Sequence, residues 1–312
     1  MGMKLENAEV STSLPKREGP RESPYLQFLQ MKFGLILEGG AMRGLFSAGV
    51  MDELMEEGIE FDGLIGVSAG AAFGCNYKSG QKGRVLRYNK RFAHDWRFCS
   101  IRSFLKTGDL YGGDFCYHYF PENLDLFDQQ AFNQSKMEFT VVCTDVETGE
   151  PVYKTLMEYD YEMCEYIRAS ASMPIVSRFV SIDGRKLLDG GISDSIPLRQ
   201  FQKMGYERNV VVATQPADYR KRHNRLMPLF RIALRKYPKL IHTLDIRHLM
   251  YNGQLDYLKA EEEKGTTFVI RPPERLDIGY TCHDTTTMDR IYQTGRNEAK
   301  KHLSEIRAFL GK

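Results

Sequence analysis

A serine set between two glycines is the first group in this sequence that could carry out chemistry. Residues 66–70 read Gly-Val-Ser-Ala-Gly, a pattern that places a serine on a sharp turn between a strand and a helix. The apolar run at 61–67 predicts a short buried strand, and the small residues at 69–74 allow a helix to begin close under a sheet. Ser68 is therefore a candidate nucleophile for acyl transfer.

A glycine-rich loop lies upstream of this serine. Residues 38–44 read Glu-Gly-Gly-Ala-Met-Arg-Gly, between a predicted strand at 32–37 and a periodic segment at 45–57 that predicts a helix. Such a loop presents unpaired backbone N–H groups at the positive end of a helix dipole, which favours an anion. A tight turn and a nucleotide phosphate site are the alternatives. The sequence lacks G-x-G-x-x-G and has no Lys-Ser or Lys-Thr pair after Gly44, which disfavours a nucleotide.

An oxyanion hole is the remaining chemical interpretation of this loop. The amide groups of Gly39, Gly40 and Ala41 would face the negative charge that develops on a tetrahedral intermediate. Arg43 either adds positive charge to that site or is a solvated surface residue, and the sequence does not separate these two roles.

A carboxylate supplies the third element. Residues 187–191 read Leu-Leu-Asp-Gly-Gly, and most Asp-Gly pairs only make turns. Here Asp189 follows a predicted strand pair at 179–182 and 185–188, and it precedes the segment Ser-Ile-Pro-Leu at 195–198. A sheet could aim a side chain at that position into a cleft.

Together, in this order, the three segments resemble the patatin-like phospholipases, over about residues 32–214. In that family the loop is Asp-Gly-Gly-Gly-x-Arg-Gly, the nucleophile lies in Gly-x-Ser-x-Gly, and the second catalytic residue is the aspartate of Asp-Gly-Gly or Asp-Gly-Ala. The resemblance implies that Ser68 is the nucleophile and Asp189 its partner. It also implies an oxyanion loop made of Gly39, Gly40, Ala41 and Gly44.

Two positions depart from the family pattern. Glu38 replaces the aspartate, and Ala41 replaces the third glycine. An alanine still offers its N–H group to an oxyanion, but it resists a positive φ at that position.

The resemblance implies a Ser-Asp dyad, in which Asp189 takes the proton of Ser68 directly and an acyl-serine forms before water hydrolyses it. An ordinary aspartate is a poor base, so we expect a partly desolvated site. A Ser-Asp-His triad stays open as the alternative because several histidines follow Asp189 in the sequence. These are His223, His242, His248, His283 and His302, for each of which we favour a surface or capping role.

Strands alternating with helices predict an α/β fold of three layers, α/β/α, with a mainly parallel central sheet. The 312 residues are expected to divide into a poorly ordered lead-in at 1–30, a catalytic domain at 31–215, and a mostly helical region at 216–312 packed on it. Within the catalytic domain, the aromatic-rich stretch 111–132 is expected to be a loop.

Charge and cysteine usage limit the partners. A net charge of +2 does not favour nucleic acid, and six cysteines without a C-x-x-C pair suggest reduced thiols and no metal or organic cofactor. Residues 220–239 form a basic amphipathic segment, which fits either a helix packed on the domain or peripheral contact with an anionic membrane surface. Without a signal region or a spanning apolar stretch, we expect a cytoplasmic protein, peripheral at most to the inner face of the membrane.

The function that these residues favour is a serine acyl hydrolase that cleaves carboxylic esters of lipids, of the phospholipase A or lysophospholipase type. Its substrate would be a lipid ester. An acyltransferase, in which the acyl group passes to an alcohol, is one alternative. A non-catalytic lipid-binding protein that kept the fold is the other.

Overall fold

The computed structural model describes residues 31–311, so the lead-in expected at 1–30 lies outside the described residues. The strands are β1 (Lys32–Leu37), β2 (Gly63–Val67), β3 (Glu138–Asp145), β4 (Pro151–Leu156), β5 (Val180–Ile182), β6 (Arg185–Asp189), β7 (Tyr206–Val212) and β8 (Thr267–Ile270). The longer helices are α2 (Gly44–Glu56), α3 (Ala69–Lys78), α4 (Arg84–Arg91), α8 (Tyr161–Ser170), α11 (Pro238–Glu263) and α12 (Thr285–Lys301). The shorter ones are α5 (Ile101–Thr107), α6 (Phe120–Asn123), α7 (Gln129–Gln134), α9 (Leu198–Lys203), α10 (Met227–Ala233) and α13 (Leu303–Phe309), with single turns η1 (Ala41–Arg43), η2 (Phe115–Tyr119) and η3 (Gly190–Ile192).

The strands between residues 31 and 311 form one sheet in the order β5-β6-β3-β2-β1-β7-β8, with β4 also paired to β3. The neighbours β3, β2, β1, β7 and β8 run parallel to one another. The remaining pairs, β3 with β4, β3 with β6 and β5 with β6, are antiparallel. Because β1 and β2 are parallel and adjacent, the loops that follow them meet at one edge of the sheet.

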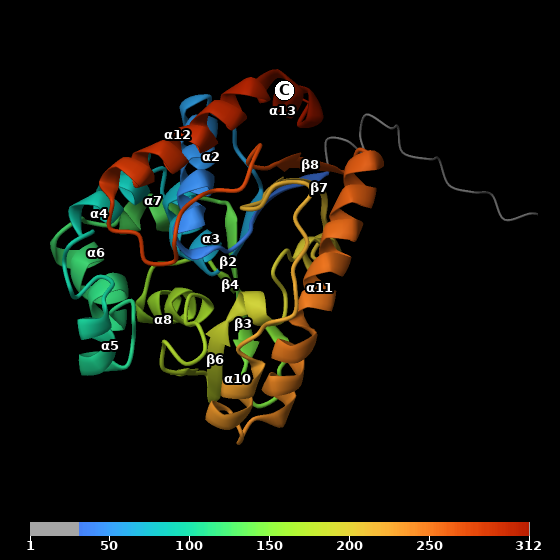
Figure 1. Ribbon diagram of the computed structural model, residues 1–312. Coiled ribbons are helices and arrows are strands. Elements are labelled where there is room, and N and C mark those ends of the chain that lie inside the picture. The colour runs from blue at the N-terminus through green and yellow to red at the C-terminus, as the bar shows by residue number, and fades with distance from the viewer. Residues whose placement is uncertain (1–30, 312) are drawn as a thin grey trace, which may run out of the picture. The chain divides into compact units, whose positions relative to one another are not determined.

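Helices cover both faces of this sheet (Figure 1). In β1 the side chains of Leu35 and Leu37 join the core cluster that includes residues of α2, α3, α8 and α12. Ile36, between them, points the other way and packs with residues of α9 and α11. All three are fully buried, which is the apolar pattern of a strand covered on both sides. The predicted three-layer α/β/α fold with a mainly parallel sheet is confirmed.

The stretch 111–132 is not the loop that the sequence suggested. It contains the π-helical turn η2, followed directly by α6 and then by the start of α7. Pro121 does not interrupt this helical stretch, because it lies in the first turn of α6, where no backbone N–H is required. The aromatic residues Phe115, Phe120 and Phe127 of this stretch are buried, so their packing holds these short helices in place.

Residues 220–239 do not form one continuous helix, and that expectation was wrong. Only Met227–Ala233 is helical, as α10, before α11 begins at Pro238. Pro228 and Pro238 each occupy the first turn of a helix, because a proline starts a helix more readily than it continues one.

Residues after 215 contribute to the same sheet and core. Strand β8 pairs with β7, and in Figure 1 helix α12 lies along α2. A Cβ atom at Gly49 of α2 would lie 2.0 Å from the carbonyl oxygen of Tyr292 in α12, so the two backbones are in close contact. The domain boundary at 215 stays a prediction. Among residues 31–311, no helix combines the length and the apolar composition that crossing a bilayer requires.

Candidate active site

Ser68 occupies a strained turn between β2 and α3. Its backbone angles are φ 56° and ψ −122°, a conformation that non-glycine residues rarely adopt and that costs roughly 1 to 3 kcal/mol. The glycine that closes the motif permits this turn, because a Cβ atom at Gly70 would lie 2.3 Å from the carbonyl oxygen of Leu37. The Ser68 N–H group donates to Oγ of Ser170, at 2.8 Å. The turn is therefore fixed from two sides.

Asp189 ends β6 and faces this serine. Its side chain is 7% exposed, and Oγ of Ser68 donates a hydrogen bond to its Oδ2 at 2.7 Å. The Gly191 N–H group donates to the other oxygen, Oδ1, also at 2.7 Å. Pairing of β6 with β3 places Asp189 opposite Cys143, and Oγ1 of Thr144 donates to the Asp189 carbonyl at 2.8 Å. The carboxylate is thus held in one orientation by the sheet and by its two donors.

Burial raises the pKa of the Asp189 carboxyl above its ordinary value, because the surroundings solvate the charged form poorly. The hydrogen bonds from Ser68 and Gly191 and the positive charges of Arg247 and Lys221 act in the opposite direction and favour the carboxylate. The result is a carboxylate more basic than one in water, as the proposed role of a proton acceptor requires.

The glycine loop passes directly against the serine. A Cβ atom at Gly39 would lie 2.8 Å from Cβ of Ser68, so only a glycine fits there without displacement. The amide groups of Gly39, Gly40 and Ala41 have no hydrogen-bond acceptor among residues 31–311. Gly44 differs, because its N–H group donates to the carbonyls of Ala41 and Met42. The structure thus places Gly39 against Ser68 and leaves the N–H groups of Gly39, Gly40 and Ala41 without an acceptor among the described residues, whereas the N–H group of Gly44 is used within the turn.

The two departures from the family loop have visible consequences. Glu38 is 3% exposed; its Oε2 accepts a hydrogen bond from the Thr214 N–H group, and its Oε1 accepts one from the Tyr251 hydroxyl, both at 2.6 Å. Its longer side chain therefore connects the loop to the end of β7 and to α11. Ala41 adopts a positive φ of 49°, the strained conformation that an alanine was expected to resist.

Arg43 lies at the outer side of this loop. Its Nε atom is buried without a hydrogen-bond partner in the described part of the chain, and its guanidinium carbon is 6.0 Å from the centroid of the Tyr280 ring. Its Nη2 atom would be 3.1 Å from a Cβ atom at Gly40. The side chain is partly buried, and it forms no ion pair with any residue from 31 to 311.

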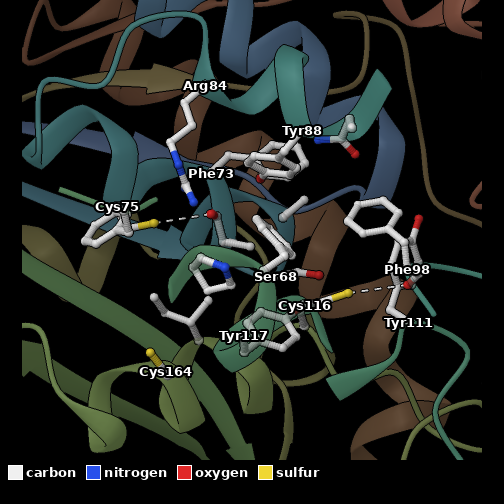
Figure 2. Close-up of a pocket in the computed structure, with 18 of the residues that line it drawn as sticks. Ser68, Phe73, Cys75, Arg84, Tyr88, Phe98, Tyr111, Cys116, Tyr117 and Cys164 are labelled. Atoms are coloured by element: carbon white, nitrogen blue, oxygen red, sulfur yellow. Dashed lines mark hydrogen bonds between the residues drawn. The ribbon is translucent and has the colours of Figure 1, made fainter. Parts of the chain in front are cut away.

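An apolar cavity of about 120 Å³ opens beside Ser68. Figure 2 shows Phe73, Tyr88, Phe98 and Tyr111 around it, together with the thiols of Cys75, Cys116 and Cys164. Burial raises the pKa of each of these thiols, to about 12 for Cys75 and about 11 for Cys164, so they are neutral and add to the apolar lining. All six cysteines are free, as expected.

The histidines that follow Asp189 in the sequence make no hydrogen bond with the dyad in the described part of the chain. Within residues 31–311, no histidine nitrogen forms a hydrogen bond with Ser68 or Asp189. His223 instead contacts Asp245, at 2.8 Å, and His302 contacts Glu305, at 2.7 Å. His248 and His283 contact backbone carbonyl oxygens, and His242 is exposed.

The site combines the parts of an ester hydrolase that acts on an apolar acyl group. These parts are a serine on a strained elbow, a buried carboxylate in contact with it, free amides and an adjoining apolar cavity. Comparison with known proteins agrees with that class. Residues 35–201 match the pattern of a family described as patatin-like phospholipase, and residues 237–311 match one described as a domain of unknown function, DUF6363.

Individual relatives were also found. The chain is 32% identical to the uncharacterized protein YjjU of Escherichia coli (strain K12), over 89% of this chain and 79% of the relative. It is 26% identical to lysophospholipase NTE1 of Scheffersomyces stipitis, over 97% of this chain but only 20% of NTE1. The crystal structure of VipD from Legionella pneumophila aligns with 88% of this chain and 67% of VipD, with a TM-score of 0.45 and 14% identity.

The chain belongs to the patatin-like phospholipase family. That membership makes it a lipid ester hydrolase by class. It spans about a fifth of the length of the NTE1 relatives that it matches.

Several residues that shape the site were not anticipated from the sequence. Ser170, Tyr251 and Arg247 lie far from the three motifs in the chain and carry no spacing signal. Lys221 was grouped with a surface segment, yet it is only partly exposed. Its proximity to Asp189 depends on how residues 213–226 fold back after β7.

Proposed function

We propose that this protein hydrolyses carboxylic esters of lipids through a Ser68-Asp189 dyad and an acyl-serine intermediate. The observation that carries the proposal is the hydrogen bond of 2.7 Å from Oγ of Ser68 to Oδ2 of Asp189. This contact gives the hydroxyl proton an acceptor, and a serine hydroxyl needs one to attack an ester.

In the proposed first step, Oγ of Ser68 attacks the ester carbonyl carbon while its proton moves to Asp189. The carbonyl oxygen becomes an oxyanion, which the free amides of Gly39, Gly40 and Ala41 stabilise. Asp189 then returns the proton to the leaving alkoxide as the carbon–oxygen bond breaks. In the second step, Asp189 takes a proton from water while the water oxygen attacks the acyl-serine carbonyl carbon. The bond between that carbon and Oγ of Ser68 then breaks, Asp189 returns the proton to Oγ, and the carboxylic acid is released.

We propose phospholipids or lysophospholipids as the substrate class. The apolar cavity beside Ser68 supports this choice, because it offers an acyl chain a lining of aromatic rings and neutral thiols. The name of the NTE1 relatives, lysophospholipase, points to the same class of ester.

The test combines covalent labelling with turnover. Wild-type protein should react with a fluorophosphonate probe and release fatty acid from lysophosphatidylcholine, whereas Ser68→Ala should do neither. Asp189→Asn should lose several orders of magnitude in turnover, because the oxyanion loop then acts without a base. Exposed Ser304 and Asp277 provide the matched controls Ser304→Ala and Asp277→Asn, both of which should behave as wild type. Turnover by Ser68→Ala would refute the assignment of the nucleophile.

We also propose that the segment 220–239 contacts an anionic membrane surface through α10. Three large apolar side chains of this part of the chain, Leu226, Leu229 and Ile232, are 49–72% exposed, and exposed arginines at 225, 231 and 235 flank them. Apolar insertion beside cationic side chains is how a surface helix binds anionic lipid. Ile232→Asp should weaken cosedimentation with phosphatidylglycerol vesicles. Equal binding by this variant and wild type would exclude α10 as the contact.

A further inference from the structure

We propose that Lys221, Arg247 and Arg43 form a subsite beside Ser68 that binds a phosphate group of the substrate. This inference rests on the proposed function and extends it by naming the part of the substrate that lies outside the apolar cavity. The three cations come from three separate segments and lie around the dyad and the oxyanion loop.

Arg247 lies next to the aspartate. It extends from α11, and its Nε–H group donates a hydrogen bond to the carbonyl oxygen of Gly191. Its Nη2 atom would be 3.2 Å from a Cβ atom at Gly191. Gly191 in turn donates to Oδ1 of Asp189, at 2.7 Å. One edge of the guanidinium is therefore bound to the turn after Asp189, and the remaining N–H groups have no acceptor among the described residues.

Lys221 lies on the side of the oxyanion loop. Its backbone is fixed by Asn252 of α11, with Lys221 N–H donating to Oδ1 at 2.8 Å and Asn252 Nδ2 donating back to the Lys221 carbonyl at 3.0 Å. Its Nζ atom is 4.8 Å from the centroid of the Tyr251 ring. The Tyr251 hydroxyl donates to Glu38, which begins the loop. The ammonium group itself forms no hydrogen bond with any residue from 31 to 311.

Among the described residues, none of the three cations of this cluster is directly paired with a carboxylate. No carboxylate in the described part of the chain lies within 4.0 Å of Lys221, Arg247 or Arg43, which appear in none of its ion pairs. By contrast, buried Arg84 pairs with Asp125 at 3.0 Å, and partly buried Arg168 pairs with Asp109 at 3.2 Å. Three partly buried cations without a directly paired anion repel one another; the nearby carboxylates of Glu38 and Asp189 offset part of this repulsion, and a bound anion would reduce it further.

The electrostatics of Lys221 agree with this geometry. Burial, together with the positive charges of Arg247 and Arg43, lowers the pKa of its ammonium group to about 8. Only the carboxylates of Glu38 and Asp189 act against that shift, and both of them already accept two hydrogen bonds. The cluster thus has unused hydrogen-bond donors and excess positive charge.

A phosphate group matches these donors and this position. Its oxygens accept charge-assisted hydrogen bonds from a guanidinium and an ammonium. In a glycerophospholipid the phosphate is joined to the same glycerol as the scissile ester, so an acyl chain in the apolar cavity leaves the phosphate near the serine, outside the cavity. Free inorganic phosphate offers the same chemistry, and the experiment has to separate the two sources.

The first arm measures selectivity. Values of kcat/KM for 1-oleoyl-lysophosphatidylcholine and 1-oleoylglycerol give a ratio that reports the phosphocholine group, because the acyl chain and the glycerol are identical. Lys221→Met should lower this ratio about tenfold or more, as expected for loss of a hydrogen bond to a charged group. Lys236→Met removes an exposed lysine of the same segment and should leave the ratio unchanged. An unchanged ratio in Lys221→Met overturns the headgroup subsite.

The second arm does not depend on turnover. Glycerol 3-phosphate and inorganic phosphate are titrated into Ser68→Ala and into Ser68→Ala/Lys221→Met by calorimetry. Loss of glycerol 3-phosphate binding in the double variant supports the subsite even if wild-type protein hydrolyses neither lipid, which would refute only the proposed function. Equal binding by both variants, or binding of inorganic phosphate alone, overturns the proposal.

A pH series adds a signature that a merely structural lysine would not give. Lys221 is a cation below its pKa of about 8 and neutral above it. The selectivity ratio of wild type should therefore fall as the pH rises from about 7 to about 9, while that of Lys221→Met stays flat. The two substrates share every other titrating group of the site, so those groups cancel in the ratio. A flat ratio in wild type contradicts the role of the ammonium group.

Discussion

The strain at Ser68 can be measured by comparing two variants that both lack the hydroxyl. Ser68→Ala keeps the Cβ atom in the backbone conformation of φ 56° and ψ −122°, whereas Ser68→Gly removes it. The strain released is roughly 1 to 3 kcal/mol. Two effects of the glycine oppose this gain in stability. The greater freedom of glycine in the unfolded chain costs roughly 0.5 to 1 kcal/mol, and the loss of one half-buried carbon costs less than about 0.8 kcal/mol. The net expectation is that the glycine variant is more stable by about 1 kcal/mol.

Equilibrium unfolding in urea is the assay, and an exposed helical position provides the matched control. Lys259 lies in α11 with its side chain 72% exposed, so Lys259→Gly should be less stable than Lys259→Ala by about 1 kcal/mol. The sign of the glycine-minus-alanine difference should thus be opposite at the two positions, with equal m-values. If Ser68→Gly were less stable than Ser68→Ala by the amount found at Lys259, the elbow would hold no strain and the reasoning would be wrong.

Three further outcomes are expected. Gly40→Val should lose about 100- to 1,000-fold in turnover, because a Cβ atom there would lie 2.8 Å from Oγ1 of Thr214. Circular dichroism checks that the variant is folded, and full activity of the folded variant would exclude this loop as the oxyanion hole. Ala41→Gly should raise the free energy of unfolding in urea by roughly 0.5 to 1 kcal/mol, since it relieves a φ of 49°, and a loss of stability would contradict that. In a pH profile, kcat/KM should fall on acidification, with a midpoint above pH 3.8. The reason is that the raised pKa of Asp189 causes its carboxylate to be protonated at a higher pH than that of an ordinary aspartate. The residual activity of Asp189→Asn should not show this acidic decrease.

The sequence predicted those parts of the fold that depend on local pattern. The apolar runs of β1 and β2 have continuous burial on both faces, and this property is visible in the residues themselves. The strained elbow follows from Gly-x-Ser-x-Gly for a similar reason, because the motif encodes a backbone geometry within five residues. The prediction of a loop at 111–132 failed because the helices there are short and are stabilised by the burial of Phe115 and Phe120. This tertiary packing overrides the local preference of glycine and proline residues for loops.

The cations around the dyad show a second limit of prediction from sequence. Lys221 appeared as one of many basic residues in an amphipathic run, and Arg247 lies in a region for which only mostly helical structure was expected. Their common location depends on the path of residues 213–226 and on the contact between Asn252 and the Lys221 backbone. No spacing rule connects residues in an irregular segment with residues on a later helix. The exchange of aspartate for Glu38 was likewise visible in the sequence, but its partner Tyr251 was not.

Helix α11 supports both halves of the site at once. Tyr251 binds Glu38 at the start of the oxyanion loop, and Arg247 binds Gly191 in the turn after the aspartate. The physical unit of function is therefore larger than the segment 35–201 that the family pattern covers. A fragment cut near residue 215 would expose a sheet edge at β7 and leave the Glu38 carboxylate buried without one of its two donors. Because the Tyr251 hydroxyl donates to Glu38, we expect substitutions at these two positions to be coupled. When segments of related proteins are recombined, positions 38 and 251 should therefore be exchanged together.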